Sequence, residues 1–250
     1  MTTSENAKTQ FVTVNEVKYA YRLLGPPTTS TPTPPLLLLQ FFRASIDHWD
    51  PLLLSLLSAH RPLILFDSAG VGHSTGTIPD SISGMAEHTS TFLEAIGVKE
   101  VHILGFSMGG MVAQQLALDA STGKAKGLII RKMILSATSP GRGPSGGEGV
   151  VDGDGKEINE RAGTPETSLE NFLKLFFLDG ESSREAGREW YARVMKRTRE
   201  SSGEERAGEV QGMGIMMQGM SMGKWAGGEG MSDCYSMTSS TAARWRREGT

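Results

Sequence analysis

A glycine-flanked serine near the middle of the chain is the residue whose setting best suits chemistry. Residues 101–110 read "VHILGFSMGG", in which Gly105, Ser107 and Gly109 form the pattern G-x-S-x-G. A serine hydroxyl at the end of a buried strand can attack a substrate only if a sharp turn lifts it clear of the sheet, and small flanking residues permit that turn. The backbone N–H of Met108 could then donate to a developing oxyanion. The pattern therefore predicts a nucleophile for acyl transfer.

A serine nucleophile needs a base, and the histidines of this chain are poorly placed to supply one. All five precede Ser107 in the sequence, namely His48, His60, His73, His88 and His102. His48 is interpreted as part of the cap of a helix that begins near Asp50, and the others as loop, helix or strand residues. None has the relation to Ser107 that would orient an imidazole within about 3 Å of its hydroxyl.

The acidic residues that could complete a catalytic triad are placed no better than the histidines. Asp152 and Asp154 follow a predicted strand but lie in a glycine-rich loop, and Asp233 lies in polar sequence of low order. In serine proteases that have lost members of the catalytic triad, the oxyanion hole and substrate binding retain an acceleration on the order of 10³–10⁴ over water. We therefore expect a feeble hydrolase.

Alternating strands and helices must position Ser107. The segments 11–14 and 17–24 alternate as a hairpin, with Asn15 and Glu16 as the tight connection. Continuously apolar runs, typical of strands buried on both faces of a parallel sheet, lie at 36–40 and 62–67, and further strands are predicted at 101–106 and 131–136. Helices are predicted between them at 47–59, 80–97 and 108–120. This order predicts an α/β fold with a doubly wound, mainly parallel sheet.

The second half of the chain is less regular. We predict a core at 1–140, a cap-like helical region at 141–230 and a low-order tail at 231–250. Two amphipathic helices of the middle region could form a lid or simply cover one face of the sheet. Its aromatic residues could face a pocket, and the sequence leaves open which of them do: Phe172, Phe176, Trp190 and Tyr191.

No strand-like segment follows Ile215, so the sheet is expected to lack its last strands. Such a sheet would expose a long hydrophobic edge, at which the chain could aggregate or pair with another chain.

Composition narrows the class of protein. The 250 residues carry a net charge of −3 without a basic stripe, which argues against nucleic acid or an anionic membrane as a partner. The longest apolar runs are shorter than the roughly 20 residues of a membrane span, and the polar N-terminus lacks a secretory signal. Cys234 is the single cysteine, which excludes an intrachain disulfide. We expect a cytoplasmic protein with a small-molecule substrate and neither metal nor cofactor.

A second motif supports the nucleophile prediction. The stretch "LFDSAGVGHSTG" places Asp67, Gly70, Gly72 and Ser74 in the pattern D-x-x-G-x-G-x-S. Together with the serine turn and with "LLLLQFFRASIDHWDP", it resembles the α/β-hydrolase family over about residues 10–140 and, more weakly, to about 230. The resemblance implies a helical cap on the fold.

The resemblance also implies roles for individual residues. Ser107 would be the nucleophile, and the backbone of Met108 and of Phe41 or Phe42 would form the oxyanion hole. Many relatives carry His-Gly where this chain has Gln40 and Phe41. With Arg43, these residues resemble a branch with a Q-x-F-R loop, which suggests hydrolases of secondary metabolism. Gln40, Arg43 and His48 are further candidates for the pocket.

In this family the catalytic residues follow the chain order Ser, then Asp or Glu, then His, and no histidine follows residue 102 here. Three interpretations of the chain are therefore open. The first is a hydrolase of a small ester, lactone or thioester with an impaired triad. The second is a truncated or altered, inactive form of such an enzyme. The third is a non-catalytic protein that binds a ligand through the same pocket. The motif does not distinguish an esterase from a carbon–carbon hydrolase or a cofactor-free peroxidase.

Overall fold

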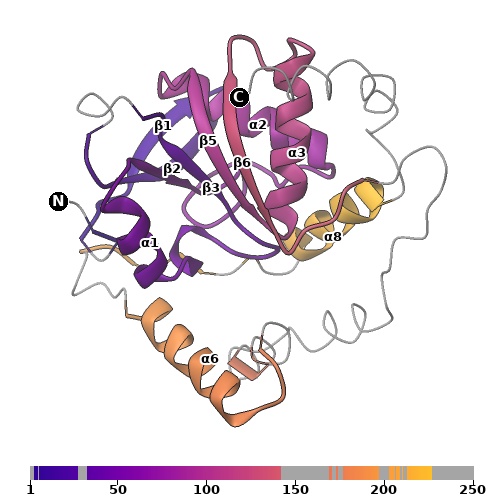
Figure 1. Ribbon diagram of the computed structural model, residues 1–250. Helices are drawn as coiled ribbons and strands as arrows, with labels where there is room; N and C mark the ends of the chain where they lie inside the picture. The colour runs from indigo at the N-terminus through magenta and orange to yellow at the C-terminus, as the bar shows by residue number, and fades with distance from the viewer. Residues whose placement is uncertain are drawn as a thin grey trace, which may run out of the picture.

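The computed structural model is a sheet covered by helices on both faces (Figure 1). It describes residues 3–4, 6–27, 33–141, 169–170, 173, 177–196, 203–205, 207–208, 210 and 213–226. Within these residues six strands lie in the order β1-β2-β4-β3-β5-β6, with bounds β1 Gln10–Val14, β2 Val17–Leu24, β3 Leu36–Leu39, β4 Leu63–Phe66, β5 Glu100–Phe106 and β6 Ile129–Ser136. The helices are α1 Pro51–Ser58, α2 Ile82–Ala95, α3 Met108–Ser121, α6 Glu181–Val194 and α8 Met213–Ala226, with a short 3₁₀ helix at Ile46–His48.

The predicted mainly parallel sheet is confirmed. Strands β3, β4, β5 and β6 are joined by parallel pairings, whereas β1 pairs with β2, and β2 with β4, in antiparallel fashion. Asn15 and Glu16 connect β1 to β2 with φ angles of 49° and 65°, the positive values that a tight hairpin turn requires. The sheet is therefore a parallel unit extended at one side by an antiparallel hairpin.

Helix boundaries follow the capping residues. The Asp50 side chain accepts a hydrogen bond from Leu52 N at 2.9 Å, and Pro51 occupies the first position of α1. The Ser81 hydroxyl likewise accepts from Gly84 N at 3.1 Å at the start of α2, and Gly97 follows the end of that helix with φ 74°. Local side-chain chemistry thus determines where both helices begin.

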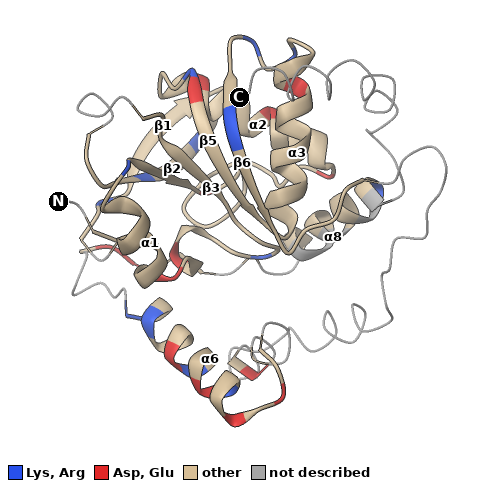
Figure 2. Ribbon diagram, viewed as in Figure 1, with Lys and Arg blue, Asp and Glu red and all other residues tan. Residues whose placement is uncertain are grey.

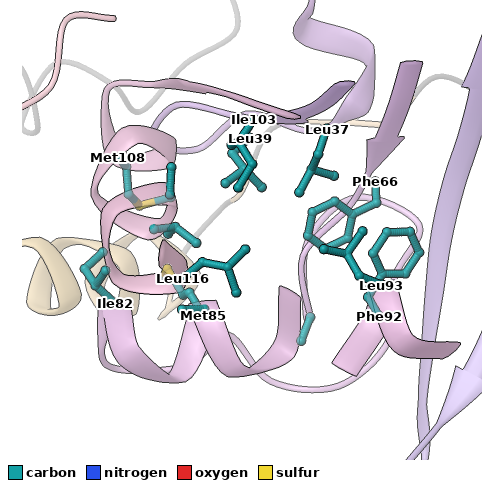
Figure 3. Close-up of a cluster of buried hydrophobic side chains, with 14 of the residues drawn as sticks. Leu37, Leu39, Phe66, Ile82, Met85, Phe92, Leu93, Ile103, Met108 and Leu116 are labelled. Atoms are coloured by element: carbon teal, nitrogen blue, oxygen red, sulfur yellow. The ribbon is translucent and has the colours of Figure 1, made fainter. Parts of the chain in front are cut away.

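Side chains of the central strands alternate between two hydrophobic layers. One layer lies beneath α2 and α3 and contains Leu37, Leu39 and Ile103 (Figure 3). Within it the rings of Phe66 and Phe92 stack with centroids 4.4 Å apart. The other layer lies beneath α1 and contains Ile46, Trp49, Leu54 and the intervening strand residues Leu36, Leu38, Leu63 and Leu65. Burial on both faces explains why these strands are continuously apolar.

The two later helices contact different parts of the core. Helix α6 lies beside α1 (Figure 1), where Arg193 forms an ion pair with Asp50 at 2.9 Å. Helix α8 packs against α2 and α3, and its Trp225 is 1% exposed. The sequence did not predict α8, because its many methionines and glycines do not produce a regular apolar stripe. No helix in the described ranges is long and apolar enough to span a bilayer.

Several predictions fall outside the described residues. These are the tail at 231–250, the acidic residues Asp152, Asp154 and Asp233, the cysteine Cys234, and the aromatic residues Phe172 and Phe176.

Candidate active site

Ser107 lies in a strained turn between β5 and α3. Its φ and ψ angles are 53° and −120°, a conformation that costs a non-glycine residue about 1–3 kcal/mol. The surrounding backbone holds the turn: Ser107 N donates to Ser136 O at 2.9 Å, and Gly110 N donates to Ser107 O at 2.8 Å. The Ser107 side chain is partly exposed. The geometry is that of a serine presented above the sheet.

The flanking glycines allow three backbone segments to meet at this turn. A Cβ atom on Gly105 would lie 2.6 Å from Gly109 O, and one on Gly109 would lie 2.1 Å from Leu39 O. A Cβ atom on Gly110 would lie 2.6 Å from the Thr138 side chain. No side chain can occupy these positions without moving backbone or a packed neighbour, so the G-x-S-x-G spacing has a steric cause.

The same close contact places the start of α3 beside the loop that follows β3. Met108 is the first residue of α3, so its N–H has no acceptor one turn earlier in the helix. The Phe41 ring packs edge-to-face on the Phe106 ring, with centroids 5.4 Å apart. The start of α3 therefore lies beside the loop that contains Phe41 and Phe42.

Gln40 and Arg43, both predicted pocket residues, make contacts that hold this loop. Gln40 Nε2 donates to Phe66 O at 2.5 Å, at the end of β4. Arg43 has a left-handed φ of 69°; its N–H donates to Gln218 Oε1 at 2.8 Å, and its carbonyl accepts from Val210 N at 2.9 Å. These contacts tie the loop to β4 and to α8.

His48, the third predicted pocket residue, is buried in the 3₁₀ turn rather than in the cap of α1. Its Nδ1 accepts a hydrogen bond from Ser45 N at 3.0 Å and lies 3.0 Å from Ser45 Oγ. An imidazole that accepts at Nδ1 carries its proton on Nε2 when it is neutral. In this tautomer neither ring nitrogen is available to take a proton from Ser107.

The remaining four histidines either form hydrogen bonds with other residues or lie away from Ser107. His88 Nδ1 lies 2.5 Å from the Tyr19 hydroxyl, and burial lowers the pKa of this histidine. His73 Nε2 donates to Glu205 O at 3.0 Å. His60 is exposed at the end of α1, and His102 lies near the start of β5, at the opposite end of the strand from Ser107. Within the described residues the Ser107 side chain has no hydrogen-bonding partner.

Asp67 is a fully buried carboxyl whose importance the sequence indicated only through its motif. It accepts hydrogen bonds from Ile46 N at 2.8 Å and from His73 N at 3.0 Å. A Cβ atom on Gly72 would lie 2.3 Å from Asp67 Oδ2, which explains that glycine. Burial raises the pKa of Asp67 to about 7, against the opposing effect of the two N–H donors. Asp67 thus joins the 3₁₀ turn at Ile46–His48 to the glycine-rich loop.

A segment that precedes α8 also contacts the loop after β3, and no sequence pattern predicted it. We call the described residues of 203–210 the strap. Ala207 N donates to Asp47 Oδ2 at 2.7 Å, and Ser45 Oγ donates to Ala207 O at 3.0 Å. Asp47 also forms a buried ion pair with Arg22.

A cavity of about 380 Å³ separates part of the strap from the glycine-rich loop. Its lining includes Gly72, Ile78 and Val210 but not Ser107. The described residues contain no cluster of histidine, cysteine and carboxylate side chains that could hold a metal ion.

Known proteins resemble the chain in both sequence and structure. The model of the alpha/beta hydrolase fold family matches residues 34–186, more than half of the chain. An alpha/beta hydrolase fold protein from Chitinophaga pinensis is 31% identical, with a TM-score of 0.73 over 90% of this chain and 74% of that protein.

Two further relatives show how far the likeness extends. RutD of Azorhizobium caulinodans, named as a carbamate hydrolase, is 32% identical over 123 residues, which cover 42% of this chain and 46% of RutD. The chain thus spans less than half the length of this curated relative. The N-acyl homoserine lactonase AidH shares the fold at 16% identity, with a TM-score of 0.58 over 89% of this chain and 70% of AidH. Sequence match, fold and serine turn agree, and the chain belongs to the alpha/beta hydrolase fold family.

Proposed function

We propose that the chain is a serine hydrolase that accepts the acyl group of a small ester, lactone or thioester on Ser107. In this step the Ser107 oxygen bonds to the substrate carbonyl carbon, the bond from that carbon to the ester oxygen or thioester sulfur breaks, and the proton of the Ser107 hydroxyl passes to that oxygen or sulfur. The observation that carries the proposal is the strained conformation of Ser107, with φ 53°, above three close-packed glycines. A strained non-glycine residue is retained where its presentation is useful.

The neighbouring backbone supports a site for the oxyanion. The N–H of Met108 belongs to the N-terminal turn of α3, where unsatisfied donors and the helix dipole favour negative charge. The loop of Phe41 and Phe42 is fixed beside it by the contacts of Gln40 and Arg43. The Met108 N–H and a backbone N–H of Phe41 or Phe42 would form a donor pair. Such a pair, held in place before the reaction, stabilises the developing negative charge without reorganisation.

We further propose that turnover by this chain is impaired. The hydrogen bonds of His48, His73 and His88 engage each ring elsewhere, and no described acid–histidine pair accompanies Ser107. A hydroxyl without a base is a weak nucleophile. Acyl transfer would therefore depend mainly on the oxyanion donors, with a residual acceleration on the order of 10³–10⁴ over water.

Added imidazole provides a direct test. Hydrolysis of p-nitrophenyl acetate is measured for the chain and for Ser107→Ala, with and without millimolar imidazole. We expect a slow Ser107-dependent rate that imidazole increases, because the free base can take the proton that no side chain takes. The hydrolysis rate measured with Ser107→Ala gives the reaction of imidazole with the ester in solution, and this background is subtracted. A panel of a lactone, a thioester and a carbamate, the last suggested by RutD, then ranks the leaving groups.

A non-catalytic role is the second candidate, favoured by the lack of a hydrogen-bonding partner for Ser107 among the described residues. Ser107-dependent ester hydrolysis separates the two candidates, and a fluorophosphonate probe, which labels activated serines, reports whether Ser107 has a base. Equal ester hydrolysis by the chain and by Ser107→Ala, together with no labelling of Ser107 in folded protein, would reject acyl transfer. Stoichiometric binding of a small ligand without turnover would then support the non-catalytic role.

A further inference from the structure

Strand β6 forms one edge of the described sheet, and its exposed side chains are unusually apolar. It pairs on one side with β5, and Met133, Ile134 and Leu135 are 40%, 54% and 42% exposed. Met133 and Leu135 pair with Ile103 and Gly105, so they face the layer of α2 and α3, whereas Ile134 faces the layer of α1. Both faces of the edge therefore present hydrophobic surface.

The backbone of this edge is directed outward at the same residues. The carbonyl of Ser136 points toward β5, where it accepts from Ser107 N at 2.9 Å. Backbone polar groups alternate between the two sides along a strand, so those of Met133 and Leu135 point away from β5. Two residues with outward N–H and C=O groups, each beside apolar side chains, are a template for a further strand.

Features that normally prevent an edge strand from pairing with another chain lie in the first half of β6. The strand carries the cationic residues Arg131 and Lys132, and a register shift falls between Val101 and His102 of its β5 partner. Charged residues and bulges of this kind discourage edge pairing. The second half of the strand, 133–136, carries neither a charge nor a bulge, so the pairing surface is confined to these residues.

We propose that β6 pairs with β6 of a second copy of the chain, antiparallel and about a twofold axis at Ile134. In this register Ile134 faces Ile134 of the other copy, and Met133 faces Leu135. Lys132 faces Ser136, so no like charges are opposed, and Arg131 is neutralised by Glu100 of its own chain at 2.7 Å. Parallel pairing in register would instead place Lys132 beside Lys132, which is destabilising.

The register also satisfies the backbone. Met133 and Leu135 of opposite copies form two hydrogen-bonded pairs, and the Ile134 pair is the non-hydrogen-bonded position, with its Cα atoms about 4.5 Å apart. Because the twofold axis uses the same surface on both copies, the assembly closes as a dimer and leaves no β6 edge for a third chain.

Oligomeric state as a function of concentration tests the proposal. Sedimentation velocity from about 1 to about 100 µM should show a reversible monomer–dimer equilibrium, because the short strand pair belongs to the small, weak class of interfaces. Ile134→Lys opposes two ammonium groups at the axis and should weaken the dimer at least tenfold. Ile129→Lys places the same charge on an equally exposed residue outside the pairing surface, so its dimer should be unchanged.

Mixing charge variants distinguishes specific pairing from general stickiness. Ile134→Glu alone should also be monomeric, whereas an equimolar mixture with Ile134→Lys should restore the dimer. A monomer throughout the concentration range would overturn the proposal. So would open-ended aggregates, or a dimer that Ile129→Lys weakens as much as Ile134→Lys does.

Discussion

The carboxylate of Asp47 accepts a hydrogen bond from the backbone N–H of Ala207, 160 residues away in the sequence, with Oδ2 and N 2.7 Å apart. The same carboxylate forms a buried ion pair with Arg22 of β2. One side chain therefore links strand β2, the 3₁₀ turn that contains Asp47, and the strap. Loss of this side chain should affect all three at once.

Replacing Asp47 with alanine should lower the free energy of unfolding by about 3–5 kcal/mol, because it leaves the Arg22 guanidinium buried without its partner. Urea denaturation followed by circular dichroism measures the change. Glu100→Ala removes the carboxylate of an exposed arginine pair, with Arg131, and should change stability far less, because water screens that pair. Similar losses in the two variants would contradict the role assigned to Asp47.

Replacing Gly109 with alanine should destabilise the fold by about 3 kcal/mol or more, since the new Cβ atom would lie 2.1 Å from Leu39 O and neither backbone segment can move freely. The variant should also lose the Ser107-dependent hydrolysis of p-nitrophenyl acetate, because α3 would shift from β3. Gly180→Ala is the control, since its Cβ atom meets nothing within 4 Å and its φ is −168°. A thermal melt of each variant decides the comparison.

Asp67 should make stability fall as the pH rises toward and past 7. Its pKa is raised from 3.8 to about 7 in the fold, so between these values the folded state binds more protons than the unfolded state. The contribution is fully present below about pH 4 and is lost as the pH rises through about 7.

The Asp67→Asn variant isolates this effect. His88, whose pKa is lowered by burial, contributes in the opposite sense, so stability from it grows as the pH rises. The difference in unfolding free energy between the chain and Asp67→Asn, measured from pH 5 to pH 8, cancels His88. We expect the difference to change by a few kcal/mol, on the order of 1.4 kcal/mol per pKa unit. A difference that is flat across this range would show that Asp67 does not titrate there.

Helix α8 should contribute to the stability of the core through Trp225. This side chain is 1% exposed, and its Nε1 donates to Ser139 O at 3.4 Å. Trp225→Ala should cost about 3–5 kcal/mol and make α8 accessible to limited proteolysis. Trp190→Ala, in the partly exposed α6, is the matched control and should cost less. Equal effects would mean that α8 is not packed on α2 and α3.

Much of the fold follows from local sequence. The strand at 36–39 is predicted because four consecutive leucines suit a strand buried on both faces, and α1 is predicted because Asp50 and Pro51 determine its first turn. The glycine spacing around Ser107 is equally local, since any side chain there would meet neighbouring backbone. In each case the residue types restrict their own immediate backbone, so no distant partner is needed.

The roles of the polar residues were decided only by tertiary structure. Gln40 and Arg43 were predicted to face a pocket, and their contacts with β4, the strap and α8 join residues as many as 175 positions apart. The protonation of Asp67 depends on burial by segments that its motif does not contain. The sequence by itself determined the family, the strands and the serine turn, because these follow from apolar periodicity and local sterics. Hydrogen-bond partners and pKa values depend on which distant segments meet in space, and only the folded chain decides that.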